Sequence, residues 1–256
     1  MDTPDNTNPI LPAPGVCRNQ AISTDASRTG SGRQNDDGST NRTLRGETSE
    51  NSRRAKALIN CRDLMQIGTL NVETLRDECK AAELEQRSIK VGIDILGIQE
   101  HRIIHDDPVE FRKIGTSYLV TSSGWRNDRQ ASQGGVGLLL SRKAKKALLD
   151  VKCISNRILV AEFDGNPKTT VVVIYSPHNS SDPSEVEQFY KDLRNTLQDV
   201  PAHNFLAVVG DFNARLGPDA APFTLHDETN RNGFLLLDLL VEFGLIANNT
   251  QFQKWK

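Results

Sequence analysis

Five polar side chains follow or end apolar stretches of this 256-residue chain: Asn71, Glu100, Tyr175, Asp211 and, close behind the last, Asn213. Each one alone is typical of a turn, a solvated strand end or half-buried packing. All of them, however, stand where a buried strand is expected to leave the core. Because strands of one packed sheet system often end at a common edge, the set predicts a single shared site.

The chemistry that suits such a set is metal-assisted hydrolysis of a phosphodiester. A hard divalent ion such as Mg²⁺, or Mn²⁺ in its place, binds oxygen ligands and commonly takes only one or two carboxylates, with water and substrate phosphate. Glu100 is the best ligand candidate, and Asp211 could orient or deprotonate a water molecule. Asn71 and Asn213 offer uncharged amides, and Tyr175 a hydroxyl. When bound, the ion stabilises charge on the phosphoryl group.

The elements that must position these residues can be read from apolar periodicity. Strands are expected at 64–71, 93–100, 118–121, 136–141, 158–163, 170–175, 205–210 and from 246 to 249. A polar, helix-compatible run follows the first strand through Ile89. A second helix begins at an Asp182 cap with a proline in the first turn, and a third covers 234–243 and ends at Gly244. Many strands with three helices predict a mixed α/β protein of stacked layers.

The N-terminal region differs in composition from the rest. Residues 1–60 are rich in Asn, Ser, Thr, Gly, Asp and Arg and contain no Phe, Tyr or Trp. Such a segment buries too little apolar surface to offset its chain entropy. The sequence therefore predicts a disordered leader over 1–60 and a folded domain over 61–256.

The net charge of −2 excludes a strongly basic nucleic-acid coat but leaves room for local basic patches. Arg126 and Arg129, next to Trp125, are candidate contacts to phosphates, with the aromatic ring able to stack on a base. The basic run from Arg142 to Lys146 has two interpretations, a phosphate contact or a solvated helix or loop face, and the second is favoured. DNA contact would have to be local.

Four scattered cysteines, Cys17, Cys61, Cys79 and Cys153, form no C-x-x-C pair, which argues against a zinc site or a disulfide framework and favours a reducing compartment. The first residues lack the basic and apolar regions of a secretory signal. The most apolar stretch, from Phe234, is too short to span a bilayer. We therefore expect an intracellular protein and leave nucleus and cytoplasm open.

Four motifs in order give the chain a family resemblance: Gly68-Thr69-Leu70-Asn71-Val72, Ile98-Gln99-Glu100, Val173-Ile174-Tyr175-Ser176-Pro177 and Gly210-Asp211-Phe212-Asn213-Ala214. They resemble the successive motifs of the endonuclease/exonuclease/phosphatase superfamily. In the residues within and around these motifs, the chain is most similar to the apurinic-type endonuclease domains of non-LTR retrotransposons and to the craniofacial development protein 2-like proteins. Stretches such as Gln99-Glu100-His101-Arg102 and Asn232-Gly233 carry this finer resemblance, which covers about residues 65–256.

The resemblance implies a four-layer α/β sandwich with two mixed central sheets. It implies that Glu100, with Asn71 beside it, binds the divalent metal. It further implies that Tyr175 contacts the scissile phosphate and that Asp211, helped by Asn213, activates the water. Apart from the resemblance, His178, just after the Tyr175 motif, has two interpretations, a contact to the substrate or an ordinary loop histidine, and the second is favoured.

The sequence departs from the family pattern in two places. Glu73 stands where retrotransposon members often carry Arg, which weakens an expected contact to the nucleic-acid backbone. The family pattern also continues with an Asp-Tyr strand and a Ser-Asp-His motif, and the chain ends at Lys256 before either. We therefore expect a fold that is incomplete at its C-terminus and a fragment that is weakly active or inactive.

Three functional hypotheses remain at this point. The first is a divalent-metal-dependent endonuclease domain of retroelement origin that nicks DNA. The second is a phosphatase of the same superfamily that acts on an inositol phosphate or a phospholipid. The third is a non-catalytic relic or interaction protein that keeps part of the fold.

Overall fold

The computed structural model describes residues 15–18, 59–60 and 65–253. Most of the predicted leader, residues 1–60, lies outside these ranges, and its disorder stays a prediction. The two short strands β1 (Gly15–Arg18) and β2 (Ile59–Asn60) are the parts of that segment that are described.

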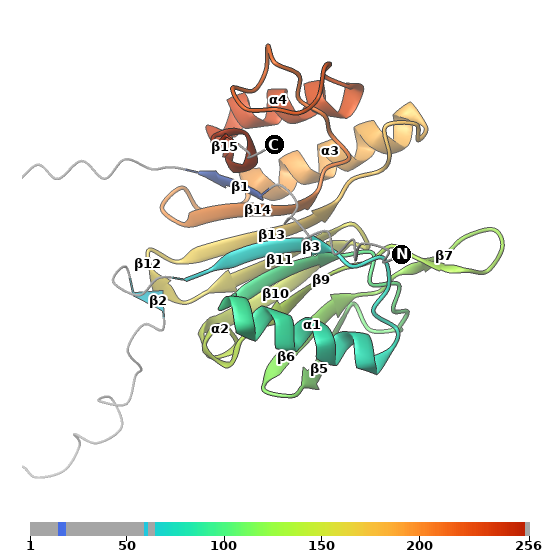
Figure 1. Cartoon of the computed structure of the whole chain (residues 1–256), viewed down its shortest axis with the longest axis vertical. Helices are drawn as coiled ribbons and strands as arrows, with labels where there is room; N and C mark the ends of the chain where they lie inside the picture. Colours follow the sequence, from blue (N-terminus) through green and yellow to red (C-terminus); the bar gives the residue numbers. More distant parts are fainter. Residues whose placement is uncertain (1–14, 19–58, 61–64, 254–256) are drawn as a thin grey trace, which may run out of the picture. The chain divides into compact units, whose positions relative to one another are not determined.

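Two mixed sheets form the centre of this part of the chain (Figure 1). The first has five strands in the order β3 (Ile67–Asn71), β4 (Ile95–Gln99), β9 (Val136–Leu140), β6 (Ser117–Ser122) and β5 (Val109–Ile114). β3 and β4 are parallel, and the other neighbours are antiparallel.

The second sheet has six strands in the order β10 (Leu148–Ser155), β11 (Ile158–Phe163), β13 (Thr169–Tyr175), β14 (Phe205–Asp211), β1 and β15 (Leu245–Ala247). Here β13 and β14 are the parallel pair. Two small pairs complete the strands: β7 (Trp125–Arg126) with β8 (Ser132–Gln133), and β12 (Gly165–Asn166) with β2. Two mixed sheets with helices confirm the predicted mixed α/β class.

The helices lie on the outer faces of the sheets (Figure 1). On the second sheet lie α3 (Pro183–Gln198) and α4 (Arg231–Phe243), whose apolar residues form one core cluster with β13 and β14. On the first sheet lies α1 (Glu78–Val91), which contributes Ala81 and Leu84 to a second cluster. The short α2 (Arg142–Ala147) and the 3-10 turn Asn248–Thr250 complete the elements.

Between the two sheets lies a third apolar cluster, to which β9 and β6 contribute from one side and β11, β13 and β14 from the other. The sheets approach so closely that a Cβ at Gly97 would fall 2.7 Å from the Val209 methyl Cγ2. All residues of β4, β9 and β13 are buried, which explains why their sequences are continuous apolar runs without polar alternation.

The elements expected from the sequence are largely present. The helix caps predicted at Asp182 and Gly244 are observed: Asp182 accepts from the Ser184 amide, and Gly244 has a left-handed backbone. The basic run from Arg142 lies on α2, with Arg142 and Lys146 exposed, and the choice between a solvated face and a phosphate contact stays a prediction. The prediction of a strand over 246–249 was only partly right, because β15 ends at Ala247 and the chain then turns.

Two longer strands, β5 and β10, were not foreseen. Both alternate exposed with half-buried residues, and both lie at the outer edge of a sheet. Several of their exposed positions are apolar, namely Phe111, Leu149 and Ile154, so an alternation of apolar and polar residues does not mark these strands in the sequence. None of the helices in the described part of the chain is long and apolar enough to cross a membrane.

Candidate active site

The amide of Asn71 joins the two carboxylates that the sequence singled out. Its Nδ2 donates to Glu100 Oε1 at 2.8 Å and to Asp211 Oδ2 at 3.3 Å. Asn71 and Glu100 come from the parallel pair β3 and β4 of the first sheet, and Asp211 comes from the second. Since both carboxylates lie within hydrogen-bonding distance of one nitrogen, the two sheets deliver them to one place.

The orientation of the Asn71 amide follows from the turn after β3. Its Oδ1 accepts from the backbone N–H of Glu73 at 3.1 Å, in a side-chain turn of the kind that Asn favours. The nitrogen end is therefore directed to the carboxylates. The oxygen, which is the atom that would ligate a cation, is engaged in the turn, so a ligand role for Asn71 stays a prediction.

Parallel pairing explains how the polar residues meet. In a parallel pair both strands run in one direction, so that their C-terminal ends lie side by side. Asn71 is in register with Gln99, directly before Glu100, and Tyr175 is in register with Asp211. Each sheet thus brings two site residues to the same end.

Glu100 lies in a tight turn with a φ of 57°, a conformation that is uncommon for residues other than glycine. The turn is held by its backbone, because the Glu100 amide donates to the Gly135 carbonyl at 3.0 Å. The next side chain, His101, is fully buried, accepts from the Ile103 amide at Nδ1 and lies 3.3 Å from the Val136 carbonyl at Nε2. These contacts require a neutral ring that is protonated at Nε2.

The electrostatic surroundings keep Glu100 ionised. Partial burial alone would raise the pKa of Glu100, but hydrogen bonds from Asn71, Arg102 and Tyr175, together with the Arg102 charge, lower it below its ordinary value. Arg102 contacts Glu100 Oε2 at 3.0 Å. An ionised carboxylate that is only 17% exposed is a suitable ligand for a hard cation.

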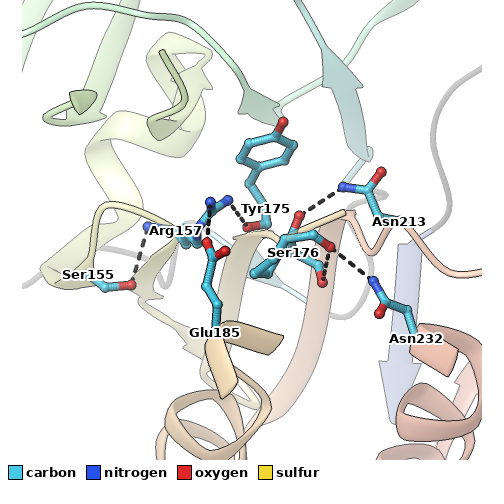
Figure 2. Close-up of polar contacts among 8 residues, drawn as sticks. Ser155, Arg157, Tyr175, Ser176, Glu185, Asn213 and Asn232 are labelled. Atoms are coloured by element: carbon cyan, nitrogen blue, oxygen red, sulfur yellow. Dashed lines mark hydrogen bonds and ion pairs between the residues drawn. The ribbon is translucent and has the colours of Figure 1, made fainter. Parts of the chain in front are cut away.

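Tyr175 is fixed by an aromatic and cationic stack. The Trp125 ring lies 6.4 Å from it at 29°, and the Arg157 guanidinium lies 4.5 Å from Trp125 and 5.3 Å from Tyr175. Arg157 also donates to the Tyr175 carbonyl at 3.3 Å and pairs with Glu185 at 2.9 Å (Figure 2). Burial, and secondly the charge of Glu100, raise the pKa of Tyr175, so its hydroxyl is a proton donor at neutral pH.

Asparagines connect the ends of β13 and β14 (Figure 2). The Asn213 amide donates to the Ser176 carbonyl at 2.8 Å, and the buried Asn232 donates to the Pro177 carbonyl at 2.9 Å. The Asn213 backbone N–H donates to Asp211 Oδ1 at 2.9 Å. The motif that contains Asp211 begins with Gly210, and a glycine is required there. Gly210 has a φ of 149°, and a Cβ at this position would lie 2.0 Å from the Ile174 carbonyl oxygen.

Two hollows adjoin these residues. One, of about 320 Å³, is lined by Glu100, Arg102, Trp125, Arg157 and Tyr175, among others. The other, of about 730 Å³, is lined by Asp211, Asn213 and residues up to Thr250. His178 lines both and lies edge-on to Tyr175 at 6.4 Å. The candidate site therefore opens on both sides of the bridged carboxylates.

The remaining sequence candidates, Arg126 and Arg129, lie apart from this group. Both are exposed on the hairpin formed by β7, β8 and the loop between them. Arg126 donates to the Gln130 carbonyl at 3.1 Å, and neither arginine is among the described residues that line the two hollows. Their neighbour Trp125, considered from the sequence as a base-stacking ring, packs against Tyr175 instead.

Sequence reasoning missed Arg157 as part of the site. It stands in the turn between β10 and β11, where no local motif marks it, and only the pairing of β11 with β13 brings it to Tyr175. Arg102 was noted within the Gln99-Glu100-His101-Arg102 stretch but was given no role. Arg102 reaches Glu100 because the two residues share a tight turn, and the sequence does not indicate that turn.

Comparison with known proteins agrees with the geometry. Residues 68–239 match the Endonuclease/Exonuclease/phosphatase family. The chain belongs to this family. The matched range includes Asn71, Glu100, Tyr175, Asp211 and Asn213, the residues on which the resemblance was first based.

The known proteins that this chain is similar to share a low sequence identity with it. Craniofacial development protein 2 of Bos taurus is 28% identical over 200 residues, which cover 76% of this chain and 32% of that protein. The chain thus spans about a third of the length of the curated relatives it matches. Among solved structures, a 3' phosphatase (NExo) from Neisseria bound to product DNA hairpin matches with a TM-score of 0.51 and 20% identity, covering 70% of this chain and 71% of that one.

A second solved structure, the AP endonuclease LMAP from Leishmania major, also has a TM-score of 0.51, with 14% identity over 70% of this chain and 66% of that one. At these identities the two structures show a shared fold. They are consistent with a family domain built on two mixed sheets.

Enzymes of this family generally use divalent metals. The oxygen donors of the candidate site suit a hard cation such as Mg²⁺. Among the described residues there is no group of three or more His, Cys, Asp and Glu side chains placed to hold a metal. Zinc sites need such a group, whereas Mg²⁺ needs one or two carboxylates and completes its shell with water and phosphate. Glu100, ionised and lining a hollow, meets that requirement.

Proposed function

We propose that this domain is a divalent-metal-dependent phosphodiesterase that nicks DNA. The observation that carries the proposal is the Asn71 amide, which holds the carboxylates of Glu100 and Asp211 on a single nitrogen. Two carboxylates from different sheets would not be expected to meet in a protein that merely keeps the scaffold, because like charges at short range are destabilising unless a donor or cation lies between them.

In this proposal Glu100 holds the cation, Mg²⁺ or Mn²⁺, with Asn71 beside it. When bound, the cation would neutralise charge that develops on the phosphoryl oxygens. Asp211 receives the proton of the attacking water, because its carboxylate opens onto the larger hollow. Asp211 Oδ1 accepts a hydrogen bond from the backbone N–H of Asn213, which fixes the Asp211 side chain in a single orientation for that task.

Tyr175, whose hydroxyl hydrogen-bonds Glu100 in the absence of substrate, would redirect this hydrogen bond to a phosphate oxygen. The raised pKa keeps this proton in place, and the Trp125 and Arg157 stack fixes the ring. Asn213 acts mainly through position, because its side-chain amide is engaged with the Ser176 carbonyl. His178, exposed between the two hollows, is placed to contact a substrate that spans them.

DNA as the substrate is supported by charge and by the fold. Arg126 and Arg129 are exposed on the hairpin that also carries Trp125, so they can reach a phosphate backbone beside the site. The Neisseria enzyme that shares the fold was solved with product DNA. The net charge of −2 limits such contact to this local patch.

We infer the finer assignment, to an endonuclease of retroelement origin with a four-layer sandwich, from the resemblance of the four motifs to those of non-LTR retrotransposon endonuclease domains. The arrangement of helices outside two facing sheets supports the layered part of it.

The test is nicking of supercoiled plasmid by the full chain with Mg²⁺ or Mn²⁺, at protein in excess over DNA. We expect slow conversion to the open circle, reduced at least about 100-fold by Glu100→Gln or by Asp211→Asn. Glu83→Gln, an exposed carboxylate on α1, is the matched control and should not change the rate.

Other outcomes would decide for the alternative hypotheses. Release of phosphate from inositol phosphates or phospholipids, with intact plasmid, would favour the phosphatase. Binding of neither metal, with no cleavage of any of these substrates, would overturn the proposal and favour a non-catalytic relic or interaction protein.

A further inference from the structure

Arg102 and Glu100 face each other within one short turn. Both residues have a φ of 57°, so two left-handed residues flank His101. Their side chains meet, with Arg102 Nη2 3.0 Å from Glu100 Oε2. Left-handed backbone is costly for residues of this type and persists only where the surroundings enforce it. Here it directs an arginine onto the carboxylate that is expected to bind a cation.

The surrounding backbone enforces this turn independently of the ion pair. The amides of Glu100 and Arg102 donate to the carbonyls of Gly135 and Gly134 at 3.0 and 2.9 Å. His101, between them, packs so closely on Gly135 that a Cβ there would fall 2.4 Å from its ring. The two charged side chains would therefore still be directed to each other if the ion pair were weakened.

The two Glu100 oxygens have different partners. Oε1 accepts from the neutral Asn71 amide, and Oε2 faces the Arg102 guanidinium. Arg102 also lines the hollow beside Glu100, and its buried Nε has no hydrogen-bond partner among the described residues. A cation that binds Glu100 from this hollow must therefore displace Arg102 or share the carboxylate with it.

We propose that Arg102 is a built-in counter-ion that competes with the divalent cation for Glu100 and so sets the metal affinity of the site. This inference rests on the proposed function, because it assumes that Glu100 binds the metal. Before metal binds, the guanidinium supplies the positive charge that a partly buried carboxylate needs. When metal binds, the same charge opposes it, so that the site binds metal more weakly than its carboxylates alone would.

The expected effect is a gain of affinity when the charge is removed. Arg102→Gln keeps much of the length and polarity of the side chain but loses the charge, and we expect metal to bind about 10-fold more tightly. Arg102→Lys keeps the charge and should bind metal within about 3-fold of the wild type. Arg87→Gln, at an exposed ion pair on α1, is the matched control.

Intrinsic fluorescence gives a readout that does not depend on activity. The chain contains two tryptophans, Trp125 and Trp255, so a Trp255→Phe background leaves Trp125 as the single tryptophan, which can be excited selectively over the tyrosines. Trp125 lines the same hollow as Glu100 and should report Mn²⁺ or Mg²⁺ titrated without DNA. Thermal melts with and without metal provide a second measurement, since Arg102→Gln should lower the metal-free midpoint and enlarge the metal-dependent rise.

The outcomes separate this inference from the function on which it rests. Tighter binding by Arg102→Gln, with wild-type affinity in Arg102→Lys and Arg87→Gln, supports it. Equal or weaker binding by a folded Arg102→Gln overturns it and leaves the proposed function intact. Absence of metal binding in the wild type and in every variant overturns both.

Discussion

The side-chain amide of Asn71 lies 3.3 Å from the carboxylate of Asp211, although the two residues belong to different sheets and are 140 positions apart. The same nitrogen lies 2.8 Å from Glu100. One donor therefore stands between two carboxylates that would otherwise repel each other. This relationship makes the stability of the domain and its proposed chemistry depend on the same small group.

Replacing Asn71 should destabilise the domain in the absence of metal. Asn71→Ala removes the shared donor and leaves two half-buried carboxylates without it, for an expected loss of about 1–3 kcal/mol in the free energy of unfolding. Urea denaturation with EDTA measures this. Asn195→Ala, at an exposed position of α3, should change the value by less than about 0.5 kcal/mol. Equal effects of the two substitutions would contradict a bridging role.

Tyr175→Phe should reduce nicking without unfolding the protein. The substitution removes the hydroxyl but keeps the ring that packs on Trp125 and Arg157. Loss of one hydrogen bond to the reacting phosphate typically costs about 100- to 1,000-fold in rate. The control is Tyr118→Phe, in β6 and away from the carboxylates, which should leave the rate unchanged.

The same residue makes a pH prediction. Burial and the Glu100 charge raise the pKa of Tyr175 above its ordinary value of 10.0, so the hydroxyl stays protonated up to at least about pH 10. The nicking rate, measured against pH, should show no loss attributable to this group between about pH 8 and 10. A wild-type rate that falls in this range, with a flat profile in Tyr175→Phe, would show that the proton is lost earlier.

His101 should make stability fall with acid. Burial, its largest cause, lowers the pKa of His101 from 6.5 to about 4. Below pH 6.5 His101 binds a proton in the unfolded chain but stays neutral in the folded domain. The free energy of unfolding therefore decreases as the pH falls towards 4. From about pH 7 to 5 the expected loss from this group is about 2 kcal/mol.

The measurement is urea unfolding of the wild type and of His101→Gln at both pH values. The variant should be less stable at neutral pH because its buried contacts change, but it should lose less stability on acidification. Parallel losses in the two proteins would show that His101 does not titrate in this window.

Glu85 should contribute more to stability than its neighbours on α1. It is 4% exposed, and its Oε1 accepts from the amides of Thr116 and Ser117 at 2.6 and 3.0 Å. Glu85→Ala leaves those amides unpaired at the start of β6 and should cost about 1–3 kcal/mol in the free energy of unfolding. Glu83→Ala, at an exposed ion pair, should cost less than about 1 kcal/mol. Denaturant midpoints measure both.

Much of the fold follows from the sequence because buried strands leave a plain signal. β4, β9 and β13 are continuous apolar runs, and α3 carries its apolar residues at helical spacing behind an Asp182 cap. β5 and β10 left no such signal because each is half-exposed at a sheet edge. Local periodicity records burial, so strands that are not buried escape it.

The site divides in the same way. The sequence by itself determined which residue types end the buried strands and in what order, and thereby the family and the reaction class to consider. Only the tertiary structure decided that Asn71 turns its nitrogen to both carboxylates, that Arg157 reaches Tyr175, and that Arg102 opposes Glu100. These contacts depend on the facing of two sheets and on a left-handed turn, and distances between segments remote in sequence are fixed by packing, which local residue patterns do not encode.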